Sequence, residues 1–111
     1  MQTNYSKISV VTSEGTYFYS PDEIIRLEAS SNYTNIFFTN KKKLLVAKVL
    51  KEFAEMLEPL GFVRTHRSHL VNRRYIMLVD SFGNIIMKDA SVAEISRRMK
   101  SGVMKELKNA A

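Results

Sequence analysis

The sequence contains no cysteine, and only four glycines and two prolines in 111 residues. The absence of cysteine excludes disulfides, thiolate catalysis and cysteine-ligated zinc, and it is typical of a reducing compartment. So few glycines leave no glycine-rich phosphate-binding loop. No apolar run approaches a membrane span, and the first residues, MQTNYSKISVV, lack the pattern of a signal peptide. We therefore expect a cytoplasmic protein without a membrane partner.

Acidic residues are missing from the middle of the chain, since none occurs between Glu58 and Asp80. Inside this gap the segment FVRTHRSHLVNRRYI, residues 62–76, holds four of the seven arginines and both histidines. Over the whole chain 17 Lys and Arg face 11 Asp and Glu, a formal charge of +6. A basic face raises both affinity and encounter rate for phosphate backbones. The charge balance therefore favours a polyanionic partner.

Length and composition predict one globular domain spanning 1–111, because 111 residues leave no room for a second core. Alternating and β-branched patterns in the first half predict strands at 7–13, 16–19, 23–29 and 33–39. Apolar spacing then becomes helical from Leu44 to Leu57, with Pro59 and Gly61 as stop signals. We interpret this segment as a supporting helix whose charges form Lys48/Glu52 and Lys51/Glu55 pairs.

The second half predicts a strand at 75–80, a turn at 81–84 and a return strand at 85–88. The C-terminal segment allows two interpretations. Ser91 and Glu94 have the spacing of a capping box at a helix start. Alternatively, a short strand covers 92–95 and Ser96 caps a helix from Arg97 to about Leu107.

Catalytic and metal-binding patterns are weak. His66 and His69 are three residues apart, and strand-like surroundings would place them on opposite faces. Without a third ligand nearby, a zinc site is not expected. No carboxylate lies beside either histidine to orient it as a base, and Ser68 has no evident activating group. We expect no enzyme activity, no metal and no cofactor.

The basic segment is rich in arginine, whose planar fork binds guanine or phosphate in a bidentate manner. Thr65, Ser68 and Asn72 add neutral donors of the kind that contact phosphate oxygens, although Asn72 is better explained by backbone hydrogen bonds at a strand end. A second cluster, SRRMK at 96–100, could add free helix-start amides if Ser96 is a cap. Spacing alone does not decide whether the two clusters share a face.

The segment FVRTHRSHLVNRRYI closely resembles the central signature of the LytTR-type DNA-binding domain. Three further blocks resemble the family in order and spacing, namely EIIRLEASSNYTNI, AKVLKEFAEMLEPLGF and VAEISRRMK. The resemblance covers a core from about residue 8 to residue 107. It implies a mainly β, elongated domain of about ten short strands in stacked sheets with one or two helices. It also favours the strand at 92–95 with a helix after it.

Members of this family insert loops into successive major grooves and bind paired direct repeats at promoters. The resemblance therefore implies a sequence-specific, double-stranded DNA-binding transcription regulator. Carried over by position, Asn32 and Thr34 would reach bases, Arg67 and Arg97 would be the principal base readers, and Lys100 would contact phosphate. The full set of expected DNA-binding residues is Asn32, Thr34, Arg64, His66, Arg67, Ser68, Ser96, Arg97, Arg98 and Lys100.

Several alternatives remain at this point. The fold could serve as a protein-interaction or autoregulatory module without DNA binding, or as a basic RNA-binding domain. The family usually follows a receiver domain in bacterial two-component response regulators, but no receiver precedes these residues, so the chain is either a stand-alone regulator or an excised domain. The resemblance implies a homodimer on DNA and leaves dimerisation off DNA open.

Overall fold

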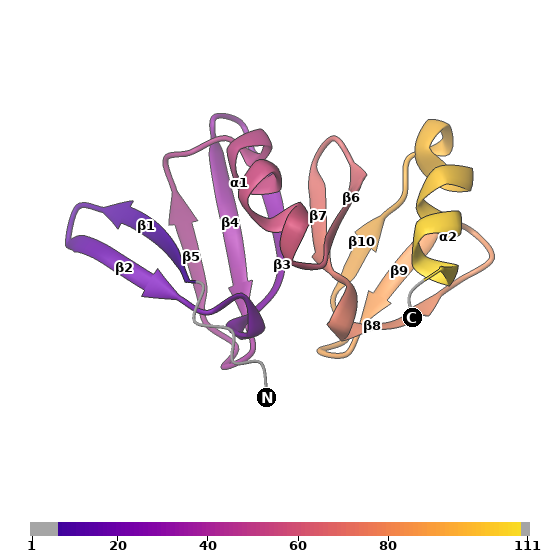
Figure 1. The fold of residues 1–111 in the computed structure, drawn as a ribbon, viewed down its shortest axis with the longest axis horizontal. Coiled ribbons are helices and arrows are strands. Elements are labelled where there is room, and N and C mark those ends of the chain that lie inside the picture. Colours follow the sequence, from indigo (N-terminus) through magenta and orange to yellow (C-terminus); the bar gives the residue numbers. More distant parts are fainter. Residues whose placement is uncertain (1–6, 110–111) are drawn as a thin grey trace.

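The computed structural model describes residues 7–109, in which ten strands form three antiparallel sheets accompanied by two α-helices (Figure 1). The first sheet is the hairpin of β1 (Ile8–Thr12) and β2 (Gly15–Tyr19). The second has the order β5-β4-β3-β7-β6, with β3 (Ile24–Ser30), β4 (Tyr33–Phe38), β5 (Lys43–Val46), β6 (Phe62–His66) and β7 (His69–Asn72). The third has the order β10-β9-β8, with β8 (Ile76–Val79), β9 (Asn84–Met87) and β10 (Val92–Glu94).

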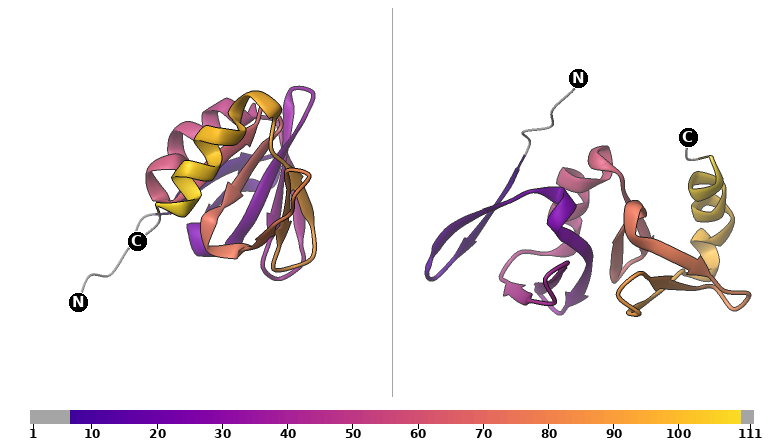
Figure 2. Two further views of the ribbon diagram at one scale, coloured as in Figure 1. Left: turned by 90° about the vertical axis from the view of Figure 1, so that its right-hand side faces the viewer. Right: turned by 90° about the horizontal axis from the view of Figure 1, so that it is seen from below.

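The helices are α1 (Leu50–Leu57) and α2 (Lys100–Lys108), and both lie on the same side of the sheets (Figure 2). Short 3-10 segments occur at η1 (Pro21–Glu23), η2 (Glu58–Leu60), η3 (Arg73–Tyr75) and η4 (Arg97–Met99). The mainly β architecture and the number of strands expected from the resemblance are confirmed. No helix of the described residues is long and apolar enough to cross a membrane.

The central helix is shorter than the sequence pattern predicts. Residues 43–46 form β5, in which Leu44 pairs with Ile36 and Val46 with Thr34. Leu44 and Val46 face the core while Leu45 is exposed, a period of two that the longer helical pattern concealed. The expected Lys48/Glu52 and Lys51/Glu55 pairs are wrong, because neither is among the ion pairs of the described residues.

The C-terminal segment follows the strand-then-helix interpretation. Ser96 is the cap of the helical segment, and its Oγ accepts a hydrogen bond from the backbone amide of Met99 at 3.2 Å. Ser91 does not cap a helix. Its hydroxyl donates to Asp89 Oδ1 at 2.6 Å and accepts from Arg26 Nε at 3.0 Å.

Two buried clusters stabilise the arrangement of the sheets. The first lies among the hairpin, the five-stranded sheet and α1, with Phe53 and Leu57 of α1 fully buried. The second lies among β7, the three-stranded sheet and α2, whose Val103 packs near Ile85 and Val71. The apolar side chains of the basic segment contribute to these clusters: Phe62, Val63, Leu70 and Val71 are buried and Ile76 is partly buried.

Polar contacts fix the three-stranded sheet to the five-stranded sheet. Arg26 of β3 is buried, with its guanidinium 4.0 Å from the Phe37 ring centroid and 2.8 Å from Glu28 Oε1. Its bond to Ser91 reaches the β9–β10 turn. At the other end of β10, Thr65 Oγ1 of β6 donates to the Glu94 carbonyl at 2.9 Å. These contacts hold β10 beside β6, and thereby determine where the C-terminal basic cluster lies.

Candidate nucleic-acid interface

Three connections lie along one edge of the molecule, the upper edge in Figure 1. They are the β3–β4 turn at 31–32, the β6–β7 turn at 67–68 and the start of the C-terminal helical segment at 96–100. The two hairpin turns share this edge because β3, β4, β6 and β7 belong to one antiparallel sheet and both hairpins reverse at the same end. We call this surface the three-loop edge.

Thr65, near the end of β6, brings the second and third connections together through two hydrogen bonds. The Ser96 amide donates to the Thr65 carbonyl at 2.9 Å, next to the hydrogen bond from Thr65 Oγ1 to Glu94. A shallow groove between the two connections is lined by His66, Arg67, Ser96, Arg98 and Met99. The two basic clusters, which their sequence spacing could not place, therefore converge on one surface.

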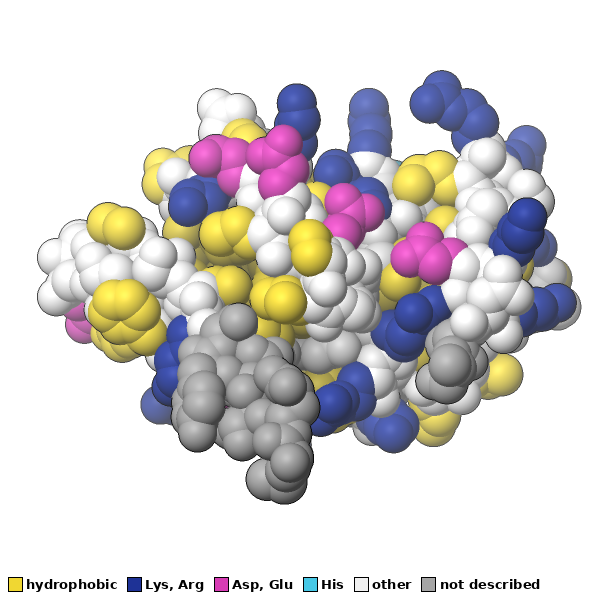
Figure 3. All heavy atoms as spheres, in the orientation of Figure 1, with side chains coloured by type: hydrophobic (Ala, Val, Ile, Leu, Met, Phe, Trp, Pro, Cys, Tyr) yellow, Lys and Arg dark blue, Asp and Glu magenta, His cyan; other side chains and the backbone are white. Residues whose placement is uncertain are grey.

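The cations of the three-loop edge have no acidic partners. Arg67, Arg97, Arg98 and Lys100 are exposed, and none of their side chains takes part in an ion pair or a hydrogen bond among residues 7–109. Lys and Arg side chains project from this edge in Figure 3. Uncompensated guanidinium groups on a projecting surface can bind a polyanion without first breaking internal contacts.

The β6–β7 turn is held in shape by two of the residues expected to contact DNA. Arg64 Nε donates to the His66 carbonyl at 3.0 Å, and Arg64 Nη2 donates to the Arg67 carbonyl at 2.5 Å. His66 Nδ1 accepts from the Ser68 amide at 3.0 Å, and the Ser68 carbonyl accepts from the Ala29 amide at 2.9 Å. Arg64 and His66 therefore brace the turn that presents Arg67.

The two histidines share a face, contrary to expectation. His66 and His69 are register partners across the turn, with ring centroids 5.3 Å apart. The expectation treated the segment as one continuous strand, whereas the chain reverses between them. Burial chiefly lowers the pKa of His69, whose Nδ1 lies 3.8 Å from Glu28 Oε1, too far for a hydrogen bond. Within residues 7–109 no three His, Cys, Asp or Glu side chains are grouped as a metal site would require.

Thr34 cannot reach a base, so this expected contact is wrong. Its side chain is fully buried, and Oγ1 donates to the Lys48 carbonyl at 2.6 Å. The first connection consists of Ser31 and Asn32 alone, because β4 begins at Tyr33. Ser31 has φ of 55°, a left-handed conformation that tightens the turn and leaves Asn32 exposed.

Two neutral donors of the basic segment are also internal. Thr65 is buried against β10, as described above. Asn72 donates from Nδ2 to the carbonyls of Ile24 at 2.9 Å and Pro21 at 3.3 Å, which confirms its expected backbone role. Its Oδ1 accepts from the amide of Arg74 at 3.1 Å.

The basic segment is divided between two ends of the molecule. Arg73 and Arg74 lie on η3, at the end of β7 opposite the β6–β7 turn. There Arg73 donates to the Glu106 carbonyl, and Arg74 Nη1 lies 3.6 Å from Asp22 Oδ1. Only the first half of the segment therefore belongs to the three-loop edge.

Sequence analysis missed two residues near this edge. Tyr33 follows Asn32 directly and is 46% exposed. Lys48 lies in the connection between β5 and α1, which runs along the same edge (Figure 1). The overlong predicted helix concealed Lys48 by assigning it to a charge-paired helical face.

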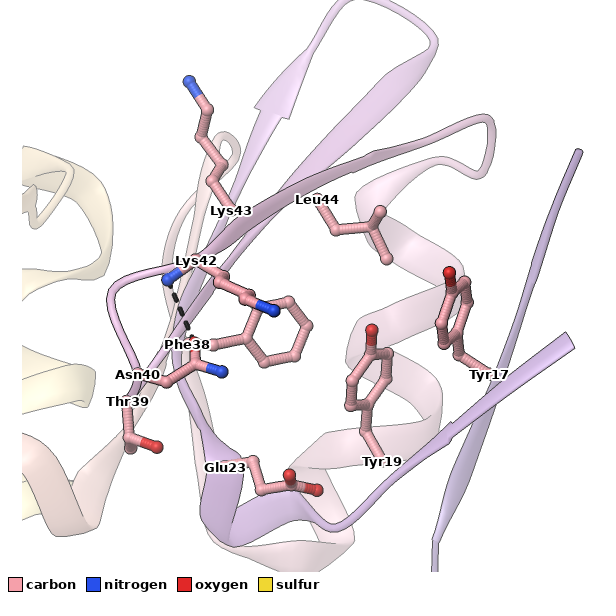
Figure 4. A pocket seen from close by; sticks show the side chains of 9 residues that line it. All are labelled: Tyr17, Tyr19, Glu23, Phe38, Thr39, Asn40, Lys42, Lys43 and Leu44. Carbon is pink, nitrogen blue, oxygen red and sulfur yellow. Dashed lines mark hydrogen bonds between the residues drawn. The ribbon is translucent and has the colours of Figure 1, made fainter. Parts of the chain in front are cut away.

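A separate hollow lies near the opposite end of β4. The rings of Tyr17, Tyr19 and Phe38 line it together with Lys42 and Leu44 (Figure 4). The Tyr19 and Phe38 ring centroids are 4.5 Å apart. No residue of the three-loop edge lines this hollow.

Comparison with known proteins agrees with the fold. The family described as the LytTr DNA-binding domain matches residues 14–108. A solved structure described as the LytTr DNA-binding domain of a methyl-accepting/DNA response regulator from Bacillus cereus superposes with a TM-score of 0.76 at 22% identity, covering 96% of this chain and 100% of that one. Among curated proteins none matches this chain. The family match spans most of the sequence, and the chain belongs to the LytTr DNA-binding domain family.

Proposed function

We propose that this protein is a sequence-specific, double-stranded DNA-binding transcription regulator that reads promoter repeats through loops in the major groove. The observation that carries the proposal is the convergence of three connections, with their unpaired arginines, on one edge. The B-DNA major groove is about 12 Å wide and admits a two-stranded β ribbon. The β6–β7 hairpin has this form, and its bracing by Arg64 lowers the entropic cost of binding.

The exposed and half-buried residues of the edge have roles that fit their chemistry. Arg67 and Arg97 act as base readers, because guanidinium forks bind guanine O6 and N7 in a bidentate manner. Asn32 reads a base edge from the first connection. Arg98 and Lys100 contact phosphates. Ser68 and Ser96 supply neutral hydrogen bonds to the backbone of the duplex.

The regulatory setting forms part of the same proposal. The similar Bacillus cereus domain is described as part of a response regulator. By extension, this chain acts in the bacterial cytoplasm as the output domain of a two-component system, under control of a receiver domain and its sensor kinase. Two copies occupy paired repeats in a promoter.

Selection from a random-sequence duplex library tests the proposal directly. Bound duplexes are recovered at near-physiological salt and sequenced. Enrichment of a motif, repeated at about one helical turn, is the expected result. Retention without enrichment would reduce the protein to a non-specific phosphate binder, and absence of retention would favour the protein-interaction module.

Two variants and an RNA competitor serve as controls for this selection. The double variant Arg67→Ala/Arg97→Ala should retain bulk DNA less well and lose the motif. The variant Arg74→Ala removes an arginine from the opposite end of the molecule and should leave the motif unchanged. Duplex RNA should compete poorly, because its deep, narrow major groove excludes the loops.

A further inference from the structure

The three-stranded sheet has one buried face and one apolar face without a partner. Ile85, Met87 and Ala93 point into the second buried cluster. On the opposite face Leu78 pairs with Ile86, and Ile86 pairs with Val92. Register partners point to the same side of a sheet, so these three side chains form a row across all three strands. Leu78 is 51% exposed and Val92 is 47% exposed.

A bulge widens this apolar row. The register of β8 against β9 shifts between Ile76 and Leu78, so Met77 does not alternate to the buried side. Met77 is 61% exposed next to Leu78. Phe82, at the β8–β9 turn, is 88% exposed although Asp80 orders this turn through bonds to two backbone amides. We call Met77, Leu78, Ile86 and Val92 the outer apolar row.

Exposed large apolar side chains are clustered in the three-stranded sheet and its β8–β9 turn. Four of the eleven large hydrophobic side chains that are exposed in the described chain are Met77, Leu78, Phe82 and Val92, all from residues 77–92. Contiguous apolar patches bordered by polar residues mark interaction surfaces, whereas single exposed residues do not. The face therefore has the properties of an interface.

Charges of opposite sign border the outer apolar row at its two ends. Glu94, paired with Asn84, lies at the end near the three-loop edge. Lys88 directly follows β9 at the other end, and strand alternation places it on the same face as Ile86. Both side chains are exposed, and neither is in an ion pair among residues 7–109.

From this pattern we infer that the outer apolar row binds a second copy of this chain, sheet against sheet, with the strands of the two copies antiparallel. A two-fold axis in the interface, perpendicular to the strands, places Ile86 over Ile86 of the second copy. The acidic end of each copy then faces the lysine end of the other. The parallel arrangement would bring the two Glu94 side chains to the same end and the two lysines to the other, which like-charge repulsion disfavours.

This surface is separate from the three-loop edge. In the antiparallel arrangement the two three-loop edges point in opposite directions, because β10 runs toward that edge in each copy (Figure 1). Self-association therefore leaves both edges uncovered. It does not depend on DNA binding, so the two proposals can fail independently.

Sedimentation velocity of the DNA-free protein over a wide concentration range tests the inference. The wild type should shift from monomer to dimer as its concentration rises. Leu78→Glu should remain monomeric, because it buries four carboxylate oxygens at the centre of the dimer without partners. Leu45→Glu is the matched control, since Leu45 is 55% exposed on the edge strand β5 of another sheet, and it should dimerise like the wild type. Far-ultraviolet circular dichroism checks that each variant is folded.

A charge exchange tests the orientation of the two copies. Lys88→Glu and Glu94→Lys should each weaken the dimer, and the double variant should restore it. A wild type that stays monomeric, as it would if the face served a different protein, overturns the inference. Equal behaviour of Leu78→Glu and Leu45→Glu overturns it as well. A double variant that fails to recover overturns the antiparallel arrangement.

Discussion

Arg64 and Arg67 lie three residues apart in one basic segment, yet they differ in what their side chains contact. Arg64 uses its guanidinium to bind two carbonyls of the β6–β7 turn, whereas Arg67 is exposed with no partner among the described residues. The same contrast separates buried Thr34 from exposed Asn32 in the first connection. For single residues, exposure and hydrogen bonding distinguish a side chain that can bind DNA from one that holds a binding loop in place.

Replacing Arg97 with Ala should weaken binding to the preferred sequence by roughly 1–3 kcal/mol and weaken binding to random duplex less. The loss follows from removing a bidentate contact to a base edge. Fluorescence anisotropy on matched and scrambled duplexes measures both affinities. Equal losses on the two duplexes would reassign Arg97 to phosphate contact.

Thr34→Val should lower the stability of the protein without changing its affinity for DNA. The variant leaves the half-buried Lys48 carbonyl without its donor and should lower the free energy of unfolding by about 1–3 kcal/mol. Affinity of the folded protein for DNA should be unchanged. Urea denaturation and anisotropy on the same samples separate the two effects, and a loss of affinity with unchanged stability would restore Thr34 as a contact.

His69 should make the protein less stable in mild acid. Its pKa is lowered from about 6.5, first by burial and then by His66 and Arg26, while Glu28 and Glu94 oppose the shift. Below pH 6.5 the unfolded chain therefore binds a proton that the folded chain does not. The free energy of unfolding consequently falls as pH decreases from 6.5 through the lowered pKa of the folded state.

Urea denaturation between pH 7.5 and about 5.5, above the range where carboxylates titrate, measures this effect. His69→Gln should flatten the dependence on pH relative to the wild type. His66→Gln serves as the comparison, because His66 is the register partner of His69 across the turn. If the free energy of unfolding of His69→Gln depends on pH as steeply as that of the wild type, His69 is not the titrating group.

Among the elements, β7 connects the three-loop edge to the opposite end of the molecule. It begins beside the β6–β7 turn at His69 and ends at Asn72, whose side chain bonds the carbonyls of η1 and the start of β3. The backbone amide of Arg73 also donates to the carbonyl of Gly61, which ends η2 with φ of 98°. These bonds fix the direction of β7, and with it the position of the turn.

Asn72→Ala should lower the free energy of unfolding by roughly 2–3 kcal/mol, because buried carbonyls of Pro21 and Ile24 lose their donor. Thermal and urea unfolding measure the loss. Asn40→Ala is a suitable control, since Asn40 is an exposed turn residue that bonds only the Lys42 amide. A change within experimental error at Asn72 would contradict the structural role assigned to it.

Over the whole molecule, net positive charge and its placement decide how strongly salt affects binding. The chain carries a formal charge of +6, and exposed cations gather along the three-loop edge while Arg73 and Arg74 have partners elsewhere. Phosphate contacts release counterions, so each contributes about −0.9 to the slope of log affinity against log salt.

Lys100→Ala should therefore weaken binding to all duplexes alike and reduce the magnitude of the salt slope by about one. Titrations at several salt concentrations measure the slope. Lys105→Ala, farther along α2, is the matched control and should leave it unchanged. A slope that is the same for Lys100→Ala and the wild type would remove Lys100 from the phosphate contacts.

The sequence by itself determined the local features of this protein. Strand patterning predicted the N-terminal hairpin and the β8–β9 hairpin, and it left Ser91 and Ser96 as alternative helix caps until the family resemblance favoured Ser96. These features depend on neighbouring residues and on simple periodicity. The family resemblance extended the prediction to the whole fold.

Only the tertiary structure decided which residues form the candidate site. The convergence of residues 67 and 97 depends on hydrogen bonds of Thr65 to β10 and Ser96, contacts between segments about thirty residues apart. Burial of Thr34 under Lys48, pairing of β5 with β4 and the approach of His66 to His69 are likewise non-local. A linear pattern records which side chains are present, but their partners across the fold determine whether they are exposed to DNA or enclosed in the protein.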